Sequence, residues 1–131
     1  MPDGPIRVLV LDDEELVLET LACFLEDQGY DVHTANTGEK ALDLLTRVHP
    51  DLAIVDMRLP GFDGNAFILK AHRLQPGLRF LIHTGSADYL PPPPLAALGI
   101  DNDNVFHKPV RDLRDFIRAI ERQIAAKDRA S

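Results

Sequence analysis

Short apolar runs alternate along this chain with segments in which apolar residues recur every three or four positions. The runs predict five strands, at about 6–11, 31–35, 52–55, 79–83 and 104–107. The periodic segments predict helices, at about 14–28, 38–48, 65–74 and 112–126. Such an alternation is typical of a parallel sheet covered by helices on both faces, and right-handed crossovers then favour a three-layer α/β sandwich.

The stretch between the fourth and fifth strands departs from this pattern. Tyr89 and Leu90 precede four prolines, 91–94, which cannot lie inside a helix because each lacks an amide donor and restrains its predecessor. Pro94 can start a short helix through Leu98, with Gly99 as its cap. We therefore expect a fourth helix that is short, displaced or partly replaced by an extended segment. A rigid loop is favoured over a ligand for a proline-reading groove.

Length and composition predict a single domain over residues 1–131, with a core at about 6–126. The net charge of −7 argues against nucleic-acid binding, because a phosphate backbone would repel such a surface. No apolar run approaches the roughly 20 residues that span a bilayer, so no membrane association is expected. The first residues lack the features of a signal peptide, which predicts a cytoplasmic location. Cys23, in an amphipathic segment, is expected to be a buried and inert thiol.

The carboxyl ends of the predicted strands carry the candidate chemistry. Asp12 and Asp13 follow the first strand, Asp56 the third, Thr84 ends the fourth and Lys108 follows the fifth. Ligands of open parallel sheets bind outside these ends, so the five side chains are expected in one cleft. Three carboxylates there suit Mg²⁺. The alternative is structural: acids favour a helix start, a lysine often makes a surface ion pair, and a threonine can simply end a strand.

A divalent cation beside Asp56 would allow its carboxylate to attack phosphorus and form an aspartyl phosphate. Such a transfer depends mainly on positioning and charge neutralisation. The cation and Lys108 would neutralise phosphoryl oxygens, and the Thr84 hydroxyl would donate to another. Gly85 adds a backbone amide that a ligand can approach closely. Each residue alone says little, and the set together predicts phosphoryl transfer.

These motifs resemble the receiver domain of two-component response regulators, with the chemotaxis response regulator as the stand-alone type. The matching segments are 8–14 (VLVLDDE), 56–64 (DMRLPGFDG), 84–85 (TG) and 108–109 (KP). The resemblance covers about residues 6–126. It implies a flavodoxin-like fold with the strand order 2-1-3-4-5 and the site where that order reverses.

The resemblance also implies roles for single residues. Asp56 would be the phosphoacceptor, Asp13 a direct Mg²⁺ ligand, Asp12 a ligand largely through water, and Arg58 a ligand through its carbonyl oxygen. Thr84 and Lys108 would contact the phosphoryl group. Lys108-Pro109 would be a cis peptide, and Gly64 would serve the backbone of a loop.

Two positions depart from the family pattern. The family usually carries a tyrosine or phenylalanine three residues before the lysine, which moves inward with the threonine; here this residue is Val105, and Phe106 has the opposite strand parity. The proline run changes the surface of the fourth helix, fifth strand and last helix, through which many members dimerise. A homodimer through this surface is a candidate assembly.

The leading hypothesis is a phosphorylation-controlled signalling switch. A histidine kinase or phosphotransfer protein, implied by the resemblance, would supply the phosphoryl group, and the receiver itself would carry out self-phosphorylation and autodephosphorylation rather than conventional turnover. Arg58 and Ser86 are expected to border the route of attacking water. Because the chain ends after the last helix, output through an unidentified downstream protein or a phosphorelay is expected.

Two alternatives remain at this point. The first is a protein-binding module that keeps the fold but signals without phosphate, which Val105 and the prolines favour and the acidic residues oppose. The second is a phosphohydrolase with an aspartyl nucleophile. Such enzymes often place a general acid two residues after the nucleophile, and here that residue is Arg58, which opposes the idea.

Overall fold

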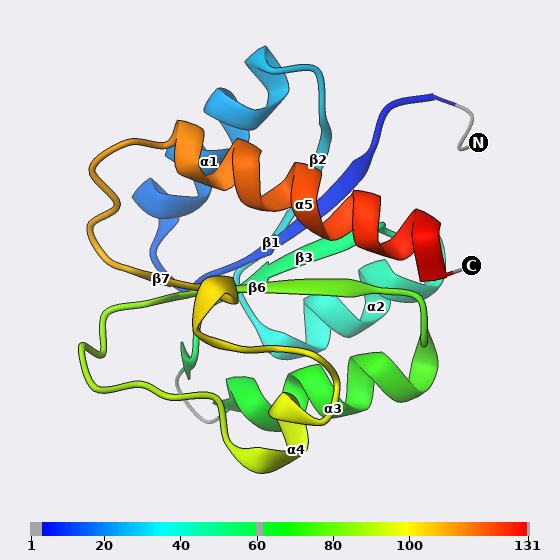
Figure 1. Cartoon of the computed structure of the whole chain (residues 1–131). Coiled ribbons are helices and arrows are strands. Elements are labelled where there is room, and N and C mark those ends of the chain that lie inside the picture. Colours follow the sequence, from blue (N-terminus) through cyan, green and yellow to red (C-terminus); the bar gives the residue numbers. More distant parts are fainter. Residues whose placement is uncertain (1–3, 60–61, 131) are drawn as a thin grey trace.

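The computed structural model describes residues 4–59 and 62–130, in which a five-stranded parallel sheet lies between two layers of helices (Figure 1). The sheet strands are β1 (Arg7–Leu11), β2 (Asp31–Ala35), β3 (Leu52–Val55), β6 (Arg79–Thr84) and β7 (Val105–His107). Their order is β2-β1-β3-β6-β7, with every pair parallel. This confirms the expected flavodoxin-like order 2-1-3-4-5 of the five sheet strands.

Helices cover both faces of the sheet. Their bounds are α1 (Glu15–Asp27), α2 (Gly38–Val48), α3 (Gly64–Leu74), α4 (Pro93–Ala96) and α5 (Arg114–Ala130). α1 and α5 pack on one face, and α2, α3 and α4 pack on the other (Figure 1). The three-layer sandwich expected from the sequence is therefore confirmed.

Strand β1 shows how the two cores are built. Val8 and Val10 face the α1 and α5 layer, whereas Leu9 and Leu11 face the opposite layer, because successive side chains of a strand point to opposite faces. All four are at most 1% exposed. A strand buried on both faces has no polar alternation, which is why the run is continuously apolar.

Two helix ends follow the expected local chemistry. The Thr37 hydroxyl accepts a hydrogen bond of 3.2 Å from the amide of Lys40 and so caps α2. After α1, Gly29 has a φ of 96°, in the region that glycine adopts most readily, and the amide of Tyr30 turns back to the carbonyl of Leu25 at 3.1 Å. Both caps confirm the sequence predictions.

The segment before β7 is irregular in the expected way. Helix α4 has a single short stretch at Pro93–Ala96, and Gly99, with a φ of 87°, ends the turn that follows. A 3₁₀ turn at Asn102–Asn104 then leads into β7, so Asn104 precedes the strand rather than starting it. The prediction of a short fourth helix is confirmed.

Other bounds differ from the prediction. Helix α5 begins at Arg114, because Asp112 accepts the Arg114 amide at 3.0 Å and lies outside the helix. The segment expected as a plain loop after β3 contains two short antiparallel strands, β4 (Arg58–Leu59) and β5 (Phe62–Asp63). Their two-residue length leaves no hydrophobic period to read.

The expected burial of Cys23 is wrong. Its side chain is exposed, because Leu18, Leu21 and Leu25 form the buried side of α1. Cys23 lies two residues from Leu21 and Leu25, about 200° around a helix with 3.6 residues per turn. Among the described residues, no helix combines the length and apolar character needed to cross a bilayer.

Candidate functional site

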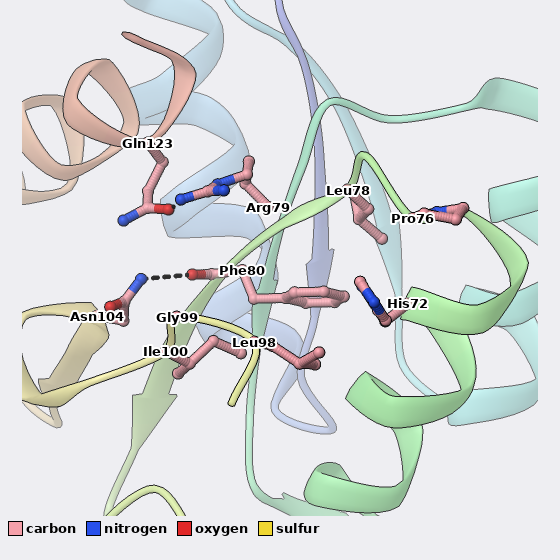
Figure 2. A pocket seen from close by; sticks show the side chains of 10 residues that line it. All are labelled: His72, Pro76, Leu78, Arg79, Phe80, Leu98, Gly99, Ile100, Asn104 and Gln123. Carbon is pink, nitrogen blue, oxygen red and sulfur yellow. Dashed lines mark hydrogen bonds between the residues drawn. The ribbon is translucent and has the colours of Figure 1, made fainter. Parts of the chain in front are cut away.

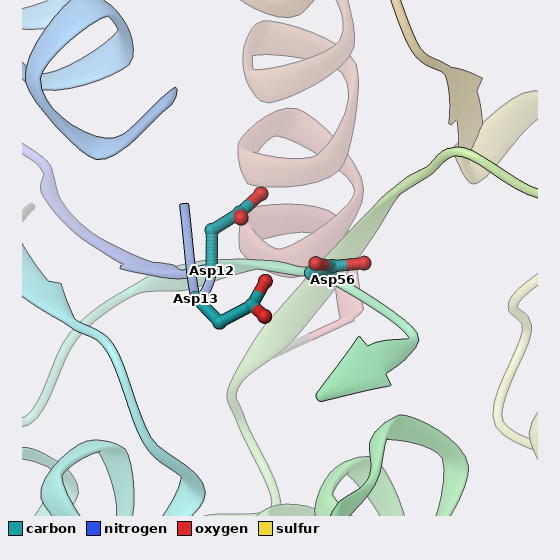
Figure 3. Close-up of side chains that lie close together, drawn as sticks. All are labelled: Asp12, Asp13 and Asp56. Atoms are coloured by element: carbon teal, nitrogen blue, oxygen red, sulfur yellow. The ribbon is translucent and has the colours of Figure 1, made fainter. Parts of the chain in front are cut away.

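Three aspartates from two strand ends meet at the carboxyl edge of the sheet (Figure 3). The amide of Asp12 donates to Ala35 at 3.2 Å and that of Asp56 to Leu11 at 2.9 Å, so the sheet hydrogen bonds continue through both residues. One carboxylate oxygen from each of Asp12, Asp13 and Asp56 lies within 4.8 Å of the others. Asp12 and Asp56 are 1% and 3% exposed, whereas Asp13 is open to solvent.

Lys108 completes the cluster from the end of β7. Its Nζ lies 2.8 Å from Asp12 Oδ2 and 3.4 Å from Asp56 Oδ2. The amide of Lys108 donates to the carbonyl of Thr84 at 2.8 Å, and the following peptide bond to Pro109 is cis, as the resemblance implied. The neighbouring strand thus holds the lysine backbone, and the side chain reaches across the sheet edge.

Glu14 also belongs to this cluster, which the sequence analysis did not anticipate. Its Oε1 lies 3.1 Å from Lys108 Nζ. The acidic run from Asp12 to Glu15 was the available signal, but helix-start acids are common, and nothing in the run distinguishes the one that turns toward the cleft. The lysine therefore has three carboxylate neighbours.

Burial and charge shift the pKa values of the two central groups. Burial raises the pKa of Asp56 above its usual value, and the charge of Asp12 adds to this, although the Arg58 amide and Lys108 act in the opposite direction. Burial alone would lower the pKa of Lys108, but hydrogen bonds with Asp12 and Glu14 and the charges of Asp12 and Asp56 leave it above its usual value. The cleft therefore holds a fully charged ammonium among crowded carboxylates.

The donor set fits a hard divalent cation. Three carboxylates offer oxygen ligands of the kind that Mg²⁺ prefers, and the exposed Asp13 leaves a side open to water. Two of the three carboxylates are buried, where their mutual repulsion is only partly relieved by one ammonium. A cation at this edge would offset the remaining negative charge.

Asp56 follows β3, and the residues expected to contact a phosphoryl group, Thr84, Gly85 and Lys108, lie at the ends of β6 and β7 on the same side of the sheet order. The Arg58 amide donates to Asp56 Oδ1 at 3.1 Å. Thr84 is fully buried, and its hydroxyl oxygen accepts from the Ser86 amide at 3.1 Å. Gly85 is exposed, and a Cβ there would meet no atom within 4 Å, so the protein itself does not require a glycine at this position.

Gly64, expected to serve the backbone of a loop, is the first residue of α3 and allows a close approach of two backbone segments. A Cβ at this position would lie 2.7 Å from the Cα of Met57, a distance that would force the backbone to move. The first turn of α3 therefore packs directly on the residue after Asp56. Asp63 caps this helix by accepting the Asn65 amide at 2.9 Å.

Val105 and Phe106 lie on opposite faces of the sheet, as strand parity predicted. Val105 packs with the α2, α3 and α4 layer, whereas Phe106 packs with the α1 and α5 layer, 4.8 Å between ring centroids from Phe116. Phe106 therefore does not replace the aromatic residue that the family usually carries at the position of Val105.

His83, one residue before Thr84, is a packed histidine. Its ring meets Phe116 edge to face at 5.2 Å, and the side chain is 6% exposed. Burial, followed by the charge of Lys108, lowers its pKa from 6.5 to about 4, so the ring is neutral at pH 7. His83 borders an open groove of about 520 Å³ that lies between α1 and the segment after β7. Glu14 and Lys108 line the end of this groove next to the aspartates.

A second, smaller cavity lies at the amino end of β6, away from the aspartates (Figure 2). Two of its polar side chains donate hydrogen bonds to neighbouring lining residues. Asn104 Nδ2 donates to the Phe80 carbonyl at 3.1 Å, and Arg79 Nε donates to Gln123 Oε1 at 3.0 Å. The cluster of Asp12, Asp13 and Asp56 lies at the other end of the sheet.

Comparison with known proteins agrees with this geometry. The pattern of the response regulator receiver domain matches residues 8–121. The chain belongs to this family. Receiver domains are parts of two-component response regulators and work in phosphorylation-controlled signalling. Members typically bind Mg²⁺ in an acidic pocket, and they interact with histidine kinases or phosphotransfer proteins.

Two relatives show how the match extends along the receiver. The alginate biosynthesis transcriptional regulatory protein AlgB of Pseudomonas putida is 39% identical over 106 residues, 70% of this chain and 23% of AlgB. The response regulator MprA of Mycolicibacterium vanbaalenii is 33% identical over 103 residues, 68% of this chain and 45% of MprA. This receiver thus spans less than half the length of either relative.

Solved structures confirm the fold. The CheY-like receiver domain protein of Methanospirillum hungatei JF-1 superposes with a TM-score of 0.83 at 27% identity, covering 98% of this chain and 100% of that one. The chemotaxis protein CheY4 of Vibrio cholerae has a TM-score of 0.77 at 22% identity and covers 91% of this receiver and 98% of its own chain. The second likeness concerns the fold alone.

Proposed function

We propose that residues 6–126 form a single receiver that accepts a phosphoryl group on Asp56 from phosphohistidine of a histidine kinase or phosphotransfer protein. The observation that carries the proposal is the buried Asp56 carboxylate, flanked by Asp12 and Asp13 and contacted by Lys108 at 3.4 Å. Membership of the receiver family supports the same reaction class.

The reaction forms and breaks one bond to phosphorus. An oxygen of the Asp56 carboxylate attacks the phosphorus of phosphohistidine, and the P–N bond breaks with its electron pair passing to the imidazole nitrogen. The product is a mixed anhydride on Asp56. Because phosphoryl transfer needs positioning and charge neutralisation more than covalent assistance, the receiver contributes most of what the step requires.

Each neighbour of Asp56 has a separate task in this proposal. The Arg58 amide orients the carboxylate, and Lys108 binds one phosphoryl oxygen through its ammonium. The Thr84 hydroxyl donates to a second oxygen, and the Gly85 amide lies next in the same segment. Asp12, Asp13, Asp56 and the Arg58 carbonyl would hold a Mg²⁺ ion, which would supply charge neutralisation for the transferred group.

The groove beside Lys108 is the proposed approach of a protein donor. It begins at Glu14 and Lys108, which contact the Asp56 cluster, and continues past Leu16, whose side chain is 74% exposed. A donor that brings phosphohistidine to Asp56 through this groove would lie against Glu14, Leu16 and Lys108. The apolar groove then supplies contact area next to the reacting atoms.

Loss of the phosphoryl group requires water to attack phosphorus and the P–O bond to Asp56 to break. Arg58 and Ser86 lie two residues after Asp56 and Thr84 and are proposed to border this route. Unchanged hydrolysis after alanine substitution of both would remove this part of the proposal.

The test is phosphate incorporation from a small acyl phosphate in the presence of Mg²⁺, measured by intact-protein mass spectrometry. Wild type should gain one phosphoryl group, and Asp56→Asn should gain none. Asp43→Asn is the matched control, because Asp43 pairs with Arg47 on the exposed surface of α2; it should label like wild type. Unlabelled wild type would overturn the proposal in favour of a phosphate-independent binding module, and equal labelling of Asp56→Asn would overturn it by placing the phosphoryl group on another residue.

A further inference from the structure

Tyr89 makes a long-range contact that neither strand pattern nor motif predicted. It lies between β6 and α4, and its hydroxyl donates to Asn65 Oδ1 at 2.6 Å, across 24 positions of sequence. Asn65 lies in the first turn of α3, next to Gly64, which packs on the residue after Asp56. The contact therefore joins two segments that leave the carboxyl edge of the sheet on either side of the cleft.

The Tyr89 hydroxyl is well suited to hold this contact. Its ring is half-buried against the core layer of α2, α3 and α4. Burial, followed by the charge of Asp63, raises the pKa of Tyr89 to about 12, so the hydroxyl remains a protonated donor at physiological pH. A short hydrogen bond at a partly buried site is less exposed to competition from water than one on the surface.

Tyr89 is also connected to Thr84, which is proposed to contact the phosphoryl group on Asp56. Its amide donates to the Ser86 carbonyl at 3.3 Å, and the Ser86 amide donates to the Thr84 hydroxyl oxygen at 3.1 Å. His107 Nδ1 lies 3.1 Å from the same Ser86 carbonyl. A continuous set of contacts thus runs from Thr84 through Ser86 to Tyr89 and ends on α3.

We infer that the hydrogen bond between Tyr89 and Asn65, the Tyr89–Asn65 latch, positions the segment 84–89 in its unphosphorylated arrangement and must be released when that segment moves toward phosphorylated Asp56. The inference rests on the proposed function of Asp56. Both residues act through the segment, so they are positioning residues rather than groups that touch the phosphoryl oxygens.

The latch explains how a receiver with Val105 can respond to phosphate. Val105 offers no polar group and packs in the same core layer as Tyr89. Movement of Thr84 and Ser86 toward new phosphoryl oxygens pulls on the Tyr89 backbone, three residues further on. Because α4 begins at Pro93, release of Tyr89 changes the position of the segment that leads into this helix.

Removing the latch should favour the phosphorylated arrangement, because a bond present only in the other arrangement no longer opposes it. Tyr89→Phe deletes the hydroxyl and keeps the ring. We expect it to bind beryllofluoride, a mimic of the phosphoryl group, roughly three- to tenfold more tightly in the presence of Mg²⁺, the range that one hydrogen bond supports. Titration calorimetry measures this affinity.

Asn65→Ala and the double variant test whether the effect belongs to the bond itself. Asn65→Ala should tighten beryllofluoride binding by a similar factor, and the double variant should add little to either single change. Tyr30→Phe is the matched control, because Tyr30 is the other tyrosine of the chain and packs in the opposite core layer. It should bind like wild type.

Amide hydrogen exchange without any phosphate mimic gives an independent readout. Tyr89→Phe should exchange several-fold faster at 86–90 and 95–98, while exchange in β1 and β2 stays unchanged, which a general loss of stability would not produce. Equal exchange and equal affinity in wild type and Tyr89→Phe, or weaker binding by Tyr89→Phe, would overturn the latch. Failure of wild type to bind beryllofluoride would instead overturn the proposed function of Asp56.

Discussion

At the amino end of β6, Arg79 and Asn104 pair with Gln123 and with the Phe80 carbonyl, so each polar group meets a complementary partner. At the carboxyl edge of the sheet, Asp12 and Asp56, which follow β1 and β3, are buried beside a lysine that is shared with Glu14. In the first arrangement Arg79 and Asn104 each donate to a neutral acceptor, whereas the second holds more negative charge than its one ammonium can balance. We therefore expect the polar residues at the amino end of β6 to stabilise the fold, and the carboxylates at the carboxyl edge of the sheet to be kept at a cost in stability.

The largest change in stability is expected for a substitution at the amino end of β6. Asn104→Ala removes the donor to the Phe80 carbonyl and the acceptor of the Asp101 amide, both in a side chain that is 3% exposed. We expect the free energy of unfolding to fall by about 2–3 kcal/mol, the cost of leaving two polar groups without partners. Urea unfolding measures the change. Asn102→Ala, an exposed neighbour in the same turn, should change it by less than about 0.5 kcal/mol.

A gain in stability, rather than a loss, is expected for a substitution in the aspartate cluster at the carboxyl edge of the sheet. Asp56→Asn replaces a buried carboxylate by a neutral amide of similar shape and removes its repulsion with Asp12. We expect the free energy of unfolding at pH 7 without Mg²⁺ to rise by about 1 kcal/mol, because binding sites are often kept at the expense of stability. A decrease in stability would show that Lys108 already balances the carboxylates.

The gain in stability expected for Asp56→Asn should depend on pH. The folded pKa of Asp56 is raised, so the folded state binds the proton more readily than the unfolded state. The charged carboxylate therefore costs stability above the folded pKa, and this cost is relieved as the pH falls through it. The difference between Asp56→Asn and wild type should shrink toward acid pH in parallel thermal melts. His83 also titrates in acid, but it is present in both proteins and cancels in the difference.

The smallest effect is expected for Gln123→Ala. The change removes the 3.0 Å hydrogen bond from Arg79 Nε at the rim of the smaller cavity, where water can replace the amide. The free energy of unfolding should fall by about 0.5 kcal/mol in the same urea experiment. A loss of stability as large as that of Asn104→Ala would mean that water cannot reach the rim of the cavity. The Arg79–Gln123 hydrogen bond would then count as a buried one.

Much of the fold could be predicted from the sequence, because buried parallel strands leave unbroken apolar runs. The run at β1 and the run at β3 each end in an aspartate, and the rule that parallel strands present their carboxyl ends at one edge placed Asp12 and Asp56 together. The proline run likewise predicted a short α4. These signals are local, and each one acts over a few residues.

What escaped prediction depends on side chains that meet through the fold. The bond between Tyr89 and Asn65 joins residues 24 positions apart and has no local pattern. The contact of Glu14 with Lys108 depends on the direction in which one of several acids turns. Cys23 was misplaced because its periodic segment left open which side of α1 faces the sheet. Predicting these contacts requires knowledge of how each helix is rotated about its axis and of the side chains that pack around it.

The brevity of β7 has a consequence for association with other chains. β7 pairs only with the last three residues of β6, which leaves the earlier part of β6 at the border of the sheet. Strand borders of this kind recruit foreign strands through unpaired backbone groups. At Phe80 the side-chain amide of Asn104 donates to the carbonyl that such a strand would use, so this side chain opposes strand addition at that position.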